Sequence, residues 1–165
     1  MLTLGIDPGT ATTGFGLVRQ IDDQLGYVQC GIITTTPKET SQDRLAIIYR
    51  RLKALIEKHR PAVVAVERLY FGENSKTAMA VGQARGIILL AAAESGIPVA
   101  EYTPLEVKLA LTGYGKAEKK QIQQMVRVLL KLPDIPKPDD AADALAVAIC
   151  HLHSHKLKSK SLVSV

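Results

Sequence analysis

Five consecutive apolar residues at positions 62–66, followed directly by Glu67, constrain the fold of this chain more than any other feature. A short apolar run without polar alternation is typical of a strand that is buried on both faces, in the middle of a parallel sheet. Residues 41–59, just before this run, have apolar side chains at spacings of three and four, which predicts an amphipathic helix. The two patterns together indicate an α/β fold.

The N-terminal residues predict three more strands. Leu2, Leu4 and Ile6 belong to a buried first strand, and residues 15–18 and 27–35 form the next two, with connections so short that antiparallel hairpins are favoured. The remaining predicted elements are a fifth, short strand at 96–100 and helices at 76–95, 104–111, 117–130 and 139–153. The expected fold class is α/β, with a five-stranded mixed sheet flanked by helices.

The chain has 165 residues, which is the size of one domain. We expect the folded domain over residues 1–153 and a basic, flexible tail over residues 154–165. Cys30 and Cys150 lie far apart and are interpreted as small buried apolar residues in a reducing compartment. The longest apolar run, at 87–93, is too short to span a bilayer, and no signal peptide pattern precedes it. We therefore expect a cytoplasmic protein with no membrane partner.

The predicted helix 76–95 has no polar residue between positions 86 and 93. A helix that is apolar all round must be covered on more than one side. In a chain of this size we expect the second cover to be another subunit, so the sequence predicts a homodimer.

Four acidic residues stand at the ends of predicted elements. Asp7 ends the first strand and Glu67 the fourth, and if these strands are parallel neighbours their backbones lie roughly 5 Å apart there. Asp140 and Asp143 share one face of the last helix, where flanking alanines allow a close approach to the sheet. Taken singly, each acid has an ordinary explanation as a turn, strand-end or helix-start residue, and Asp139 fits the role of a cap.

Taken together, the acids predict a metal site. Carboxylates gathered in one place repel each other and raise each other's pKa unless a cation neutralises them. A ligand set of oxygen atoms without His or Cys suits Mg²⁺ or Mn²⁺. Paired divalent ions held in this way are a common means of hydrolysing a phosphodiester, because one generates hydroxide and the other stabilises the leaving oxygen.

The charge of the chain is compatible with a nucleic-acid substrate. Lys and Arg number 21 against 16 Asp and Glu, which gives a net charge of +5. The isoelectric point of 9.2 exceeds the value of about 9 that suggests a nucleic-acid footprint. The candidate phosphate contacts are the basic residues Lys76, Arg85, Lys108, Lys116, Lys119 and Lys120.

Five short motifs resemble, in order and spacing, those of the RuvC family of crossover (Holliday) junction endodeoxyribonucleases. They are GIDPG at 5–9, VE at 66–67, GQARG at 82–86, AEK at 117–119 and DAADALA at 140–146. The resemblance implies an RNase H-like fold, a homodimer, and Mg²⁺-dependent paired nicking of four-way DNA junctions in recombination and DNA repair. It also implies the RuvA–RuvB branch-migration complex as a partner in the cell.

The resemblance implies that Asp7, Glu67, Asp140 and Asp143 are catalytic ligands of two Mg²⁺ ions per subunit, for which Mn²⁺ can substitute. Some relatives carry His where Asp140 stands, and Asp139 is an alternative ligand at the start of the same helix. The nicks would leave a 5′-phosphate and a 3′-hydroxyl.

The resemblance also implies DNA contacts. Tyr70 would stack on a base at the junction centre, a contact that tolerates any base, while its neighbour Phe71 is assigned to the core. Lys108 and Lys119 occupy positions that resemble basic DNA-contacting positions in the family.

Three other functions agree with parts of the pattern. A sugar-kinase or actin-like ATPase also begins with a phosphate loop similar to Asp7-x-Gly9 with Gly14, but that class needs a second, repeated domain that 165 residues do not hold. A catalytically silent DNA-binding module of the same fold would not need the full set of acids. A nuclease of this fold that acts on RNA is a further alternative.

Overall fold

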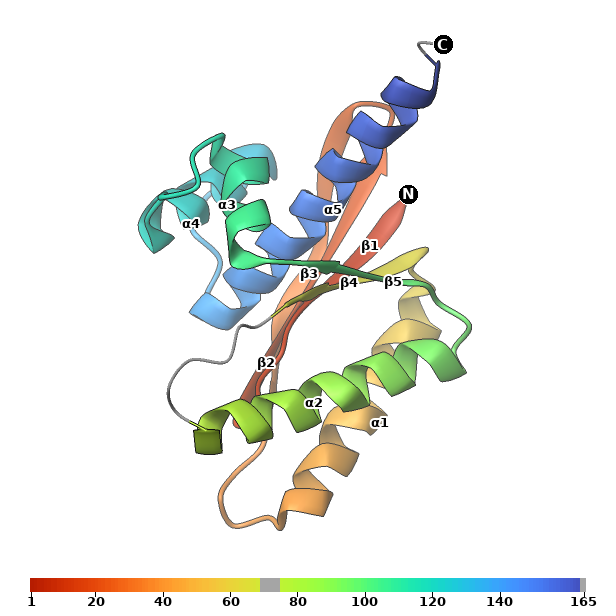
Figure 1. Cartoon of the computed structure of the whole chain (residues 1–165), viewed down its shortest axis with the longest axis vertical. Coiled ribbons are helices and arrows are strands. Elements are labelled where there is room, and N and C mark those ends of the chain that lie inside the picture. The colour runs from red at the N-terminus through yellow and green to blue at the C-terminus, as the bar shows by residue number, and fades with distance from the viewer. Residues whose placement is uncertain (69–74, 164–165) are drawn as a thin grey trace.

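The computed structural model of the chain describes residues 1–68 and 75–163, with the side chains of 75–76 and 156–163 excepted. In the part of the chain that it describes, five strands form a single sheet in the order β3-β2-β1-β4-β5 (Figure 1). The strands are β1 (Leu2–Asp7), β2 (Thr12–Ile21), β3 (Gln24–Thr34), β4 (Val63–Glu67) and β5 (Val99–Tyr102). The predicted five-stranded mixed sheet is confirmed.

The pairing of β1 with β4 is the part of the topology that matters for the site. β1, β2 and β3 pair as antiparallel hairpins, whereas β4 runs parallel to β1 and β5 runs parallel to β4. Ile6 is opposite Val66, so the next residues, Asp7 and Glu67, end their two strands side by side. The expectation that the first and fourth strands are parallel neighbours is therefore confirmed.

Two helical layers cover the sheet (Figure 1). The helices are α1 (Ser41–His59), α2 (Ser75–Glu94), α3 (Pro104–Thr112), α4 (Lys119–Leu129) and α5 (Asp139–Val163). Leu4 and Ile6 of β1 belong to a core shared with α1 and α2, while a second core joins α5 to α3 and α4. No helix among residues 1–68 and 75–163 is both long enough and apolar enough to pass through a bilayer.

Helix α5 lies directly on the backbone of β1 and β2, because glycines face it. A Cβ atom on Gly5 would overlap the carbonyl oxygen of Ala144, and one on Gly14 would overlap that of Asp140. A Cβ on Gly16 would lie 2.7 Å from the backbone nitrogen of Leu145. The missing side chains let the start of α5 approach the end of β1.

Several predicted boundaries differ from the structure. Helix α5 continues to Val163 instead of ending at 153, and β2 begins earlier and ends later than expected because it pairs on both sides. The fifth strand starts at Val99, since Gly96 takes a left-handed conformation and closes the turn after α2. The separate basic tail at 154–165 stays a prediction.

Candidate active site

The ends of β1 and β4 bring the first two predicted acids together. Asp7 is the last residue of β1 and Glu67 the last of β4, and both side chains are half-buried. The carboxyl ends of parallel strands are the usual place for a site in an α/β sheet, because no strand residue follows to cover them. The loop after Asp7 turns back into β2, so that Gly14 pairs with Asp7.

The start of α5 supplies the other two acids. The backbone of Asp140 lies against Gly14, which is the β2 partner of Asp7. Asp143 is one helical turn further on, and its side chain is only 29% exposed. The close approach of α5 to the glycines therefore directs the first turn of this helix at the ends of β1 and β4.

Electrostatics show that the four carboxylates form one cluster. The pKa of Asp7 is raised from 3.8 to about 8, first by burial and then by the negative charges of Glu67, Asp143 and Asp140. Burial, followed by the charge of Asp143, also raises the pKa of Glu67. Shifts of this kind indicate acidic groups that lie near one another in a partly buried environment. We call Asp7, Glu67, Asp140 and Asp143 the acid cluster.

Lys119 brings a positive charge to the acid cluster. The ammonium of Lys119 lies 3.1 Å from Oδ2 of Asp143 and 3.2 Å from Oδ2 of Asp139. Burial raises the pKa of Asp143, while the ion pair with Lys119 opposes this rise. The sequence assigned Lys119 to a DNA phosphate, and its contacts with two aspartates were not anticipated.

Asp139 differs from Asp140 in its contacts. The side-chain nitrogen of the buried Gln123 donates a hydrogen bond to Oδ1 of Asp139 at 3.1 Å, and Lys119 holds the other oxygen. Both partners belong to α4, so Asp139 joins α4 to α5. The charges of both Asp139 and Asp140 raise the pKa of Asp143, but of these two it is Asp140 that also raises the pKa of Asp7. The geometry favours Asp140 over Asp139 as the member of the acid cluster.

The donor set of the acid cluster fits a hard divalent cation. All of its donors are carboxylate oxygens, which suit Mg²⁺ and Mn²⁺, and their mutual repulsion is what a cation would relieve. Among residues 1–68 and 75–163, no three His, Cys, Asp or Glu side chains already converge as a ready-made metal site. The carboxylate side chains would therefore have to move closer together to coordinate a cation. The cation would then lie near the ammonium of Lys119.

Polar contacts that the sequence did not reveal fix the loop after Asp7. The hydroxyl of Thr35 donates to the carbonyl oxygen of Thr10 at 2.5 Å, and Nε of Arg44 donates to the same hydroxyl at 2.7 Å. The hydroxyl of Thr13 donates to the carbonyl oxygen of Gly9 at 2.5 Å. No spacing in the sequence signals these contacts, because Arg44 comes from α1 and Thr35 follows β3.

The predicted DNA-contacting residues differ from one another in what the structure shows of their contacts. Tyr70 lies outside the described residues, as does the side chain of Lys76. Arg85 donates to Glu101 from Nε at 3.0 Å and also from Nη2, and Arg68 approaches the same carboxylate at 3.6 Å. Arg68, which the sequence did not single out, follows Glu67 directly and is half exposed.

The remaining lysines lie near the start of α4. Lys116 and Lys120 are exposed on either side of the Lys119 position, and Lys108 of α3 is partly exposed. Their positions on α3 and at the start of α4 leave them accessible to solvent.

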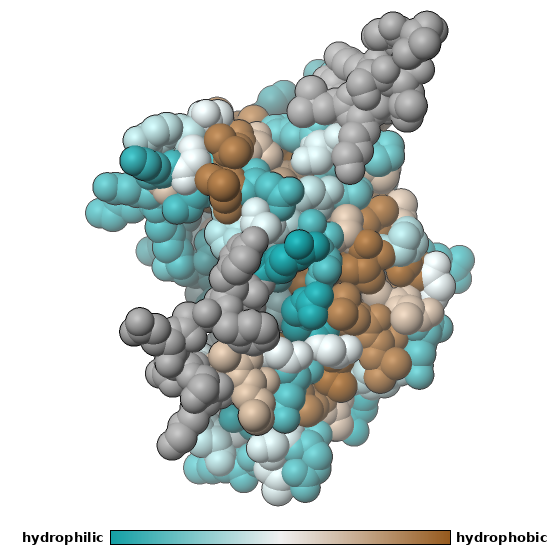
Figure 2. All heavy atoms as spheres, viewed as in Figure 1, coloured by the Kyte–Doolittle hydropathy of each residue, from teal (hydrophilic) through white to brown (hydrophobic). Residues whose placement is uncertain are grey.

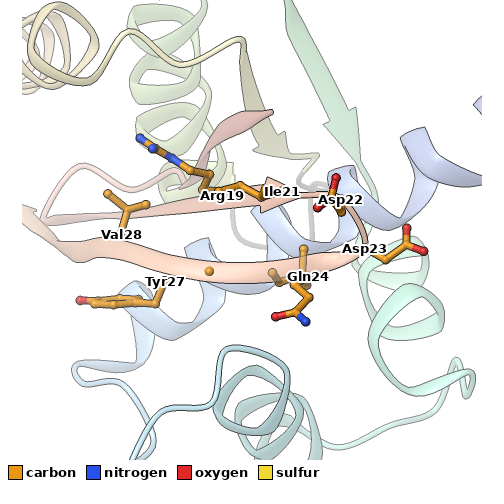
Figure 3. Close-up of a pocket in the computed structure, with 9 residues that line it drawn as sticks. Arg19, Ile21, Asp22, Asp23, Gln24, Tyr27 and Val28 are labelled. Carbon is orange, nitrogen blue, oxygen red and sulfur yellow. The ribbon is translucent and has the colours of Figure 1, made fainter.

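The hollow drawn in Figure 3 is remote from the acids. It has a volume of 880 Å³ and is lined by the β2–β3 hairpin, from Arg19 to Val28. Arg19 pairs with Leu2 at the far end of β1, whereas Asp7 ends that strand. The hollow is therefore separate from the acid cluster.

Comparison with known proteins gives a consistent result. The model of the family "Crossover junction endodeoxyribonuclease RuvC" matches residues 3–151. The chain is 55% identical, over 92% of its length and 90% of the relative, to the crossover junction endodeoxyribonuclease RuvC of Roseiflexus sp..

Two solved structures of Thermus thermophilus RuvC have the same fold. The first superposes with a TM-score of 0.89 at 36% identity and covers 96% of this chain and 97% of its own. The second, in complex with a Holliday junction substrate, gives a TM-score of 0.88 at 34% identity and covers 95% and 96%. The match confirms the predicted RNase H-like fold.

Proposed function

Because the chain belongs to the RuvC family of crossover junction endodeoxyribonucleases, we propose that it nicks four-way DNA junctions at the acid cluster. The observation that carries this proposal is the shared electrostatic environment of Asp7, Glu67, Asp140 and Asp143 at the carboxyl ends of β1 and β4. Four partly buried carboxylates gathered in one place repel each other, and a divalent cation would relieve this repulsion. The Thermus thermophilus relative in complex with a Holliday junction substrate supports the choice of DNA.

The four carboxylates would hold two Mg²⁺ ions per subunit, or Mn²⁺ in their place. Bound there, the ions would provide a hydroxide nucleophile and stabilise the leaving oxygen, so that the nick has a 5′-phosphate and a 3′-hydroxyl. The protein's own part is to position the ligands. Gly5 and Gly14 let α5 reach the sheet, and the contact between Arg44 and Thr35 fixes the loop after Asp7.

The surroundings of the acid cluster suit a polyanion. Lys108, Lys116 and Lys120 are exposed or partly exposed on α3 and near the start of α4, and Arg68 follows Glu67 in the chain with a half-exposed side chain. Phosphate contacts of this kind release counterions, so binding would weaken steeply with salt. Base stacking by Tyr70 belongs to the same proposal.

The proposed homodimer uses an unpartnered face of α2. Met79, Gly82, Gly86 and Leu90 follow each other at spacings of three and four; Met79 is 70% and Leu90 47% exposed. Among the residues that the structure describes, and apart from the neighbouring backbone of α2 itself, no atom lies within 4 Å of a Cβ built on either glycine. Figure 2 has a hydrophobic region where α2 and the edge strand β5 lie. A second copy would cover this face, and two sites related by a two-fold axis would match the symmetry of a four-way junction.

The same proposal includes the protein's location and its partner in the cell. The protein would act in the cytoplasm, where chromosomal DNA is its substrate. The RuvA–RuvB branch-migration complex would deliver junctions to it, as the family membership suggests.

The test uses an end-labelled four-way junction and a linear duplex of matched sequence. With Mg²⁺, the wild-type protein should nick the junction alone, at two symmetric positions, while Asp143→Asn should bind the junction without cutting it. Binding without cutting by the wild-type protein, in either Mg²⁺ or Mn²⁺, would favour a silent DNA-binding module. Cutting of RNA in preference to the junction would overturn the choice of substrate.

A further inference from the structure

The position of Lys119 in its helix needs an explanation. It is the first residue of α4, and the first turn of this helix contains no acidic residue. A helix N-terminus carries partial positive charge, so acidic residues stabilise it and lysines do not. A lysine at the first position of α4 therefore does not stabilise this helix. Its position is explained by the two carboxylates of α5 that it contacts, Asp139 and Asp143.

Lys119 reaches the acid cluster from the solvent side. Its side chain remains 54% exposed although its ammonium lies 3.1 Å from Asp143. The positive charge also lowers the pKa of Asp7 and of Glu67, which partly offsets the repulsion among the acids. The ammonium of Lys119 thus places a positive charge beside Asp143, which is also where a bound divalent cation would place one.

Asp139 ties Lys119 to the same place by a second contact. One oxygen of Asp139 accepts from Gln123, which lies one turn further along α4, and the other lies 3.2 Å from Lys119. Both carboxylate oxygens of Asp139 therefore contact side chains of α4. Asp143 is different, because it also interacts with Asp7 and Glu67.

We propose that Lys119 is a tethered counterion of the acid cluster, which neutralises Asp143 until a divalent cation takes its place. Lys119 then gives up Asp143 and stays beside the site on Asp139, where its ammonium faces the DNA. The inference rests on the proposed function, which supplies the metal site.

The physical reason for the exchange is competition for one carboxylate. The oxygen of Asp143 that lies next to the ammonium is not free to bind a metal ion, and two cations at that distance repel each other. A lysine side chain is long and flexible, and Lys119 is more than half exposed, so it moves at small cost. The contact with Asp139 keeps it close, because Gln123 fixes that carboxylate.

The first experiment measures the reactivity of each lysine toward an amine-modifying reagent by mass spectrometry, in wild-type protein with EDTA or with Mn²⁺. Release from Asp143 should raise the reactivity of Lys119 at least twofold, because the ammonium loses the stabilisation that one partly exposed ion pair provides. Lys120, next to it on α4, should change less. Unchanged or reduced reactivity of Lys119 would overturn the proposal.

The second experiment measures the Kd for Mn²⁺ by calorimetry. Lys119→Met should bind Mn²⁺ about fivefold more tightly than wild type, since no ammonium competes for Asp143. Lys120→Met, which removes the same charge from the same helix turn, is the matched control and should lie closer to wild type. Equal or weaker binding by Lys119→Met would refute the counterion role.

The two experiments separate this inference from the proposed function. If wild-type protein binds no Mn²⁺, the proposed metal site is wrong and the counterion role fails with it. If the wild-type protein binds Mn²⁺ but neither the reactivity of Lys119 nor the Kd of Lys119→Met changes as expected, only the counterion role fails. If Lys119→Met does not fold, the reactivity of wild-type Lys119 decides alone.

Discussion

Replacing Asp7 by Asn is expected to stabilise the metal-free protein at alkaline pH. In the folded state the pKa of Asp7 is raised from 3.8 to about 8, chiefly by burial. Between these two values the unfolded chain releases the proton that the folded protein keeps, so the free energy of unfolding falls as pH rises. Below pH of about 4 both states are protonated and this loss is absent.

The magnitude follows from the pKa shift. A shift from 3.8 to about 8 corresponds to at most about 6 kcal/mol of destabilisation. Water and salt reach the open side of the site, so we expect about 2–3 kcal/mol in practice. Asn has nearly the shape of protonated Asp and carries no charge. Asp7→Asn should therefore be more stable than wild type by this amount at about pH 8.5.

The assay is urea unfolding followed by circular dichroism, with EDTA, across the pH range from about 4 to 8.5. Asp134→Asn, which removes an exposed carboxylate from the connection between α4 and α5, is the control and should stay within about 0.5 kcal/mol of wild type. The reasoning is refuted if Asp7→Asn is no more stable than wild type at alkaline pH, or if the advantage does not shrink as the pH falls.

Three other predictions concern the metal, the packing and the dimer. The affinity for Mg²⁺ should rise with pH and level off above about pH 8, because the cation binds the ionised form of Asp7; a pH-independent Kd from calorimetry would contradict this. Gly5→Ala should cost about 2–3 kcal/mol of unfolding free energy in urea, because α5 cannot retreat from β1, whereas Gly26→Ala should be nearly neutral, because its new Cβ would only reach ordinary contact, 3.7 Å from the carbonyl oxygen of Arg19. Leu90→Glu should make the protein monomeric by light scattering, and a dimer that survives this change would exclude the α2 face.

The sequence was sufficient for the strands and helix faces that carry the acids. Alternation in β1 and the apolar run in β4 predict two buried strands that end in Asp7 and Glu67, whereas their parallel pairing was a condition that the structure meets. The spacing of Asp140 and Asp143 gives a common helix face in the same way. These features are periodic and local, which is why they can be read before the fold is known.

Other features depend on contacts between distant elements. Nothing in the sequence indicates that Gly5 lies under α5, because the reason for this glycine is the carbonyl oxygen of a helix far along the chain. A lysine at a helix start is ordinarily a solvated residue, so the contact of Lys119 with Asp143 required the structure. The pairing of Arg85 with Glu101 is hidden for the same reason, since α2 and β5 meet only in the fold.

The most direct measurement is the location of Mn²⁺ by anomalous scattering in crystals of the protein soaked with this ion. The account predicts the strongest peaks among the carboxylates of Asp7, Glu67, Asp140 and Asp143. The same soak of Asp7→Asn crystals should weaken or remove them. Ordered Mn²⁺ elsewhere on the protein, with none at the acid cluster, would contradict the assignment of these four residues as the catalytic centre.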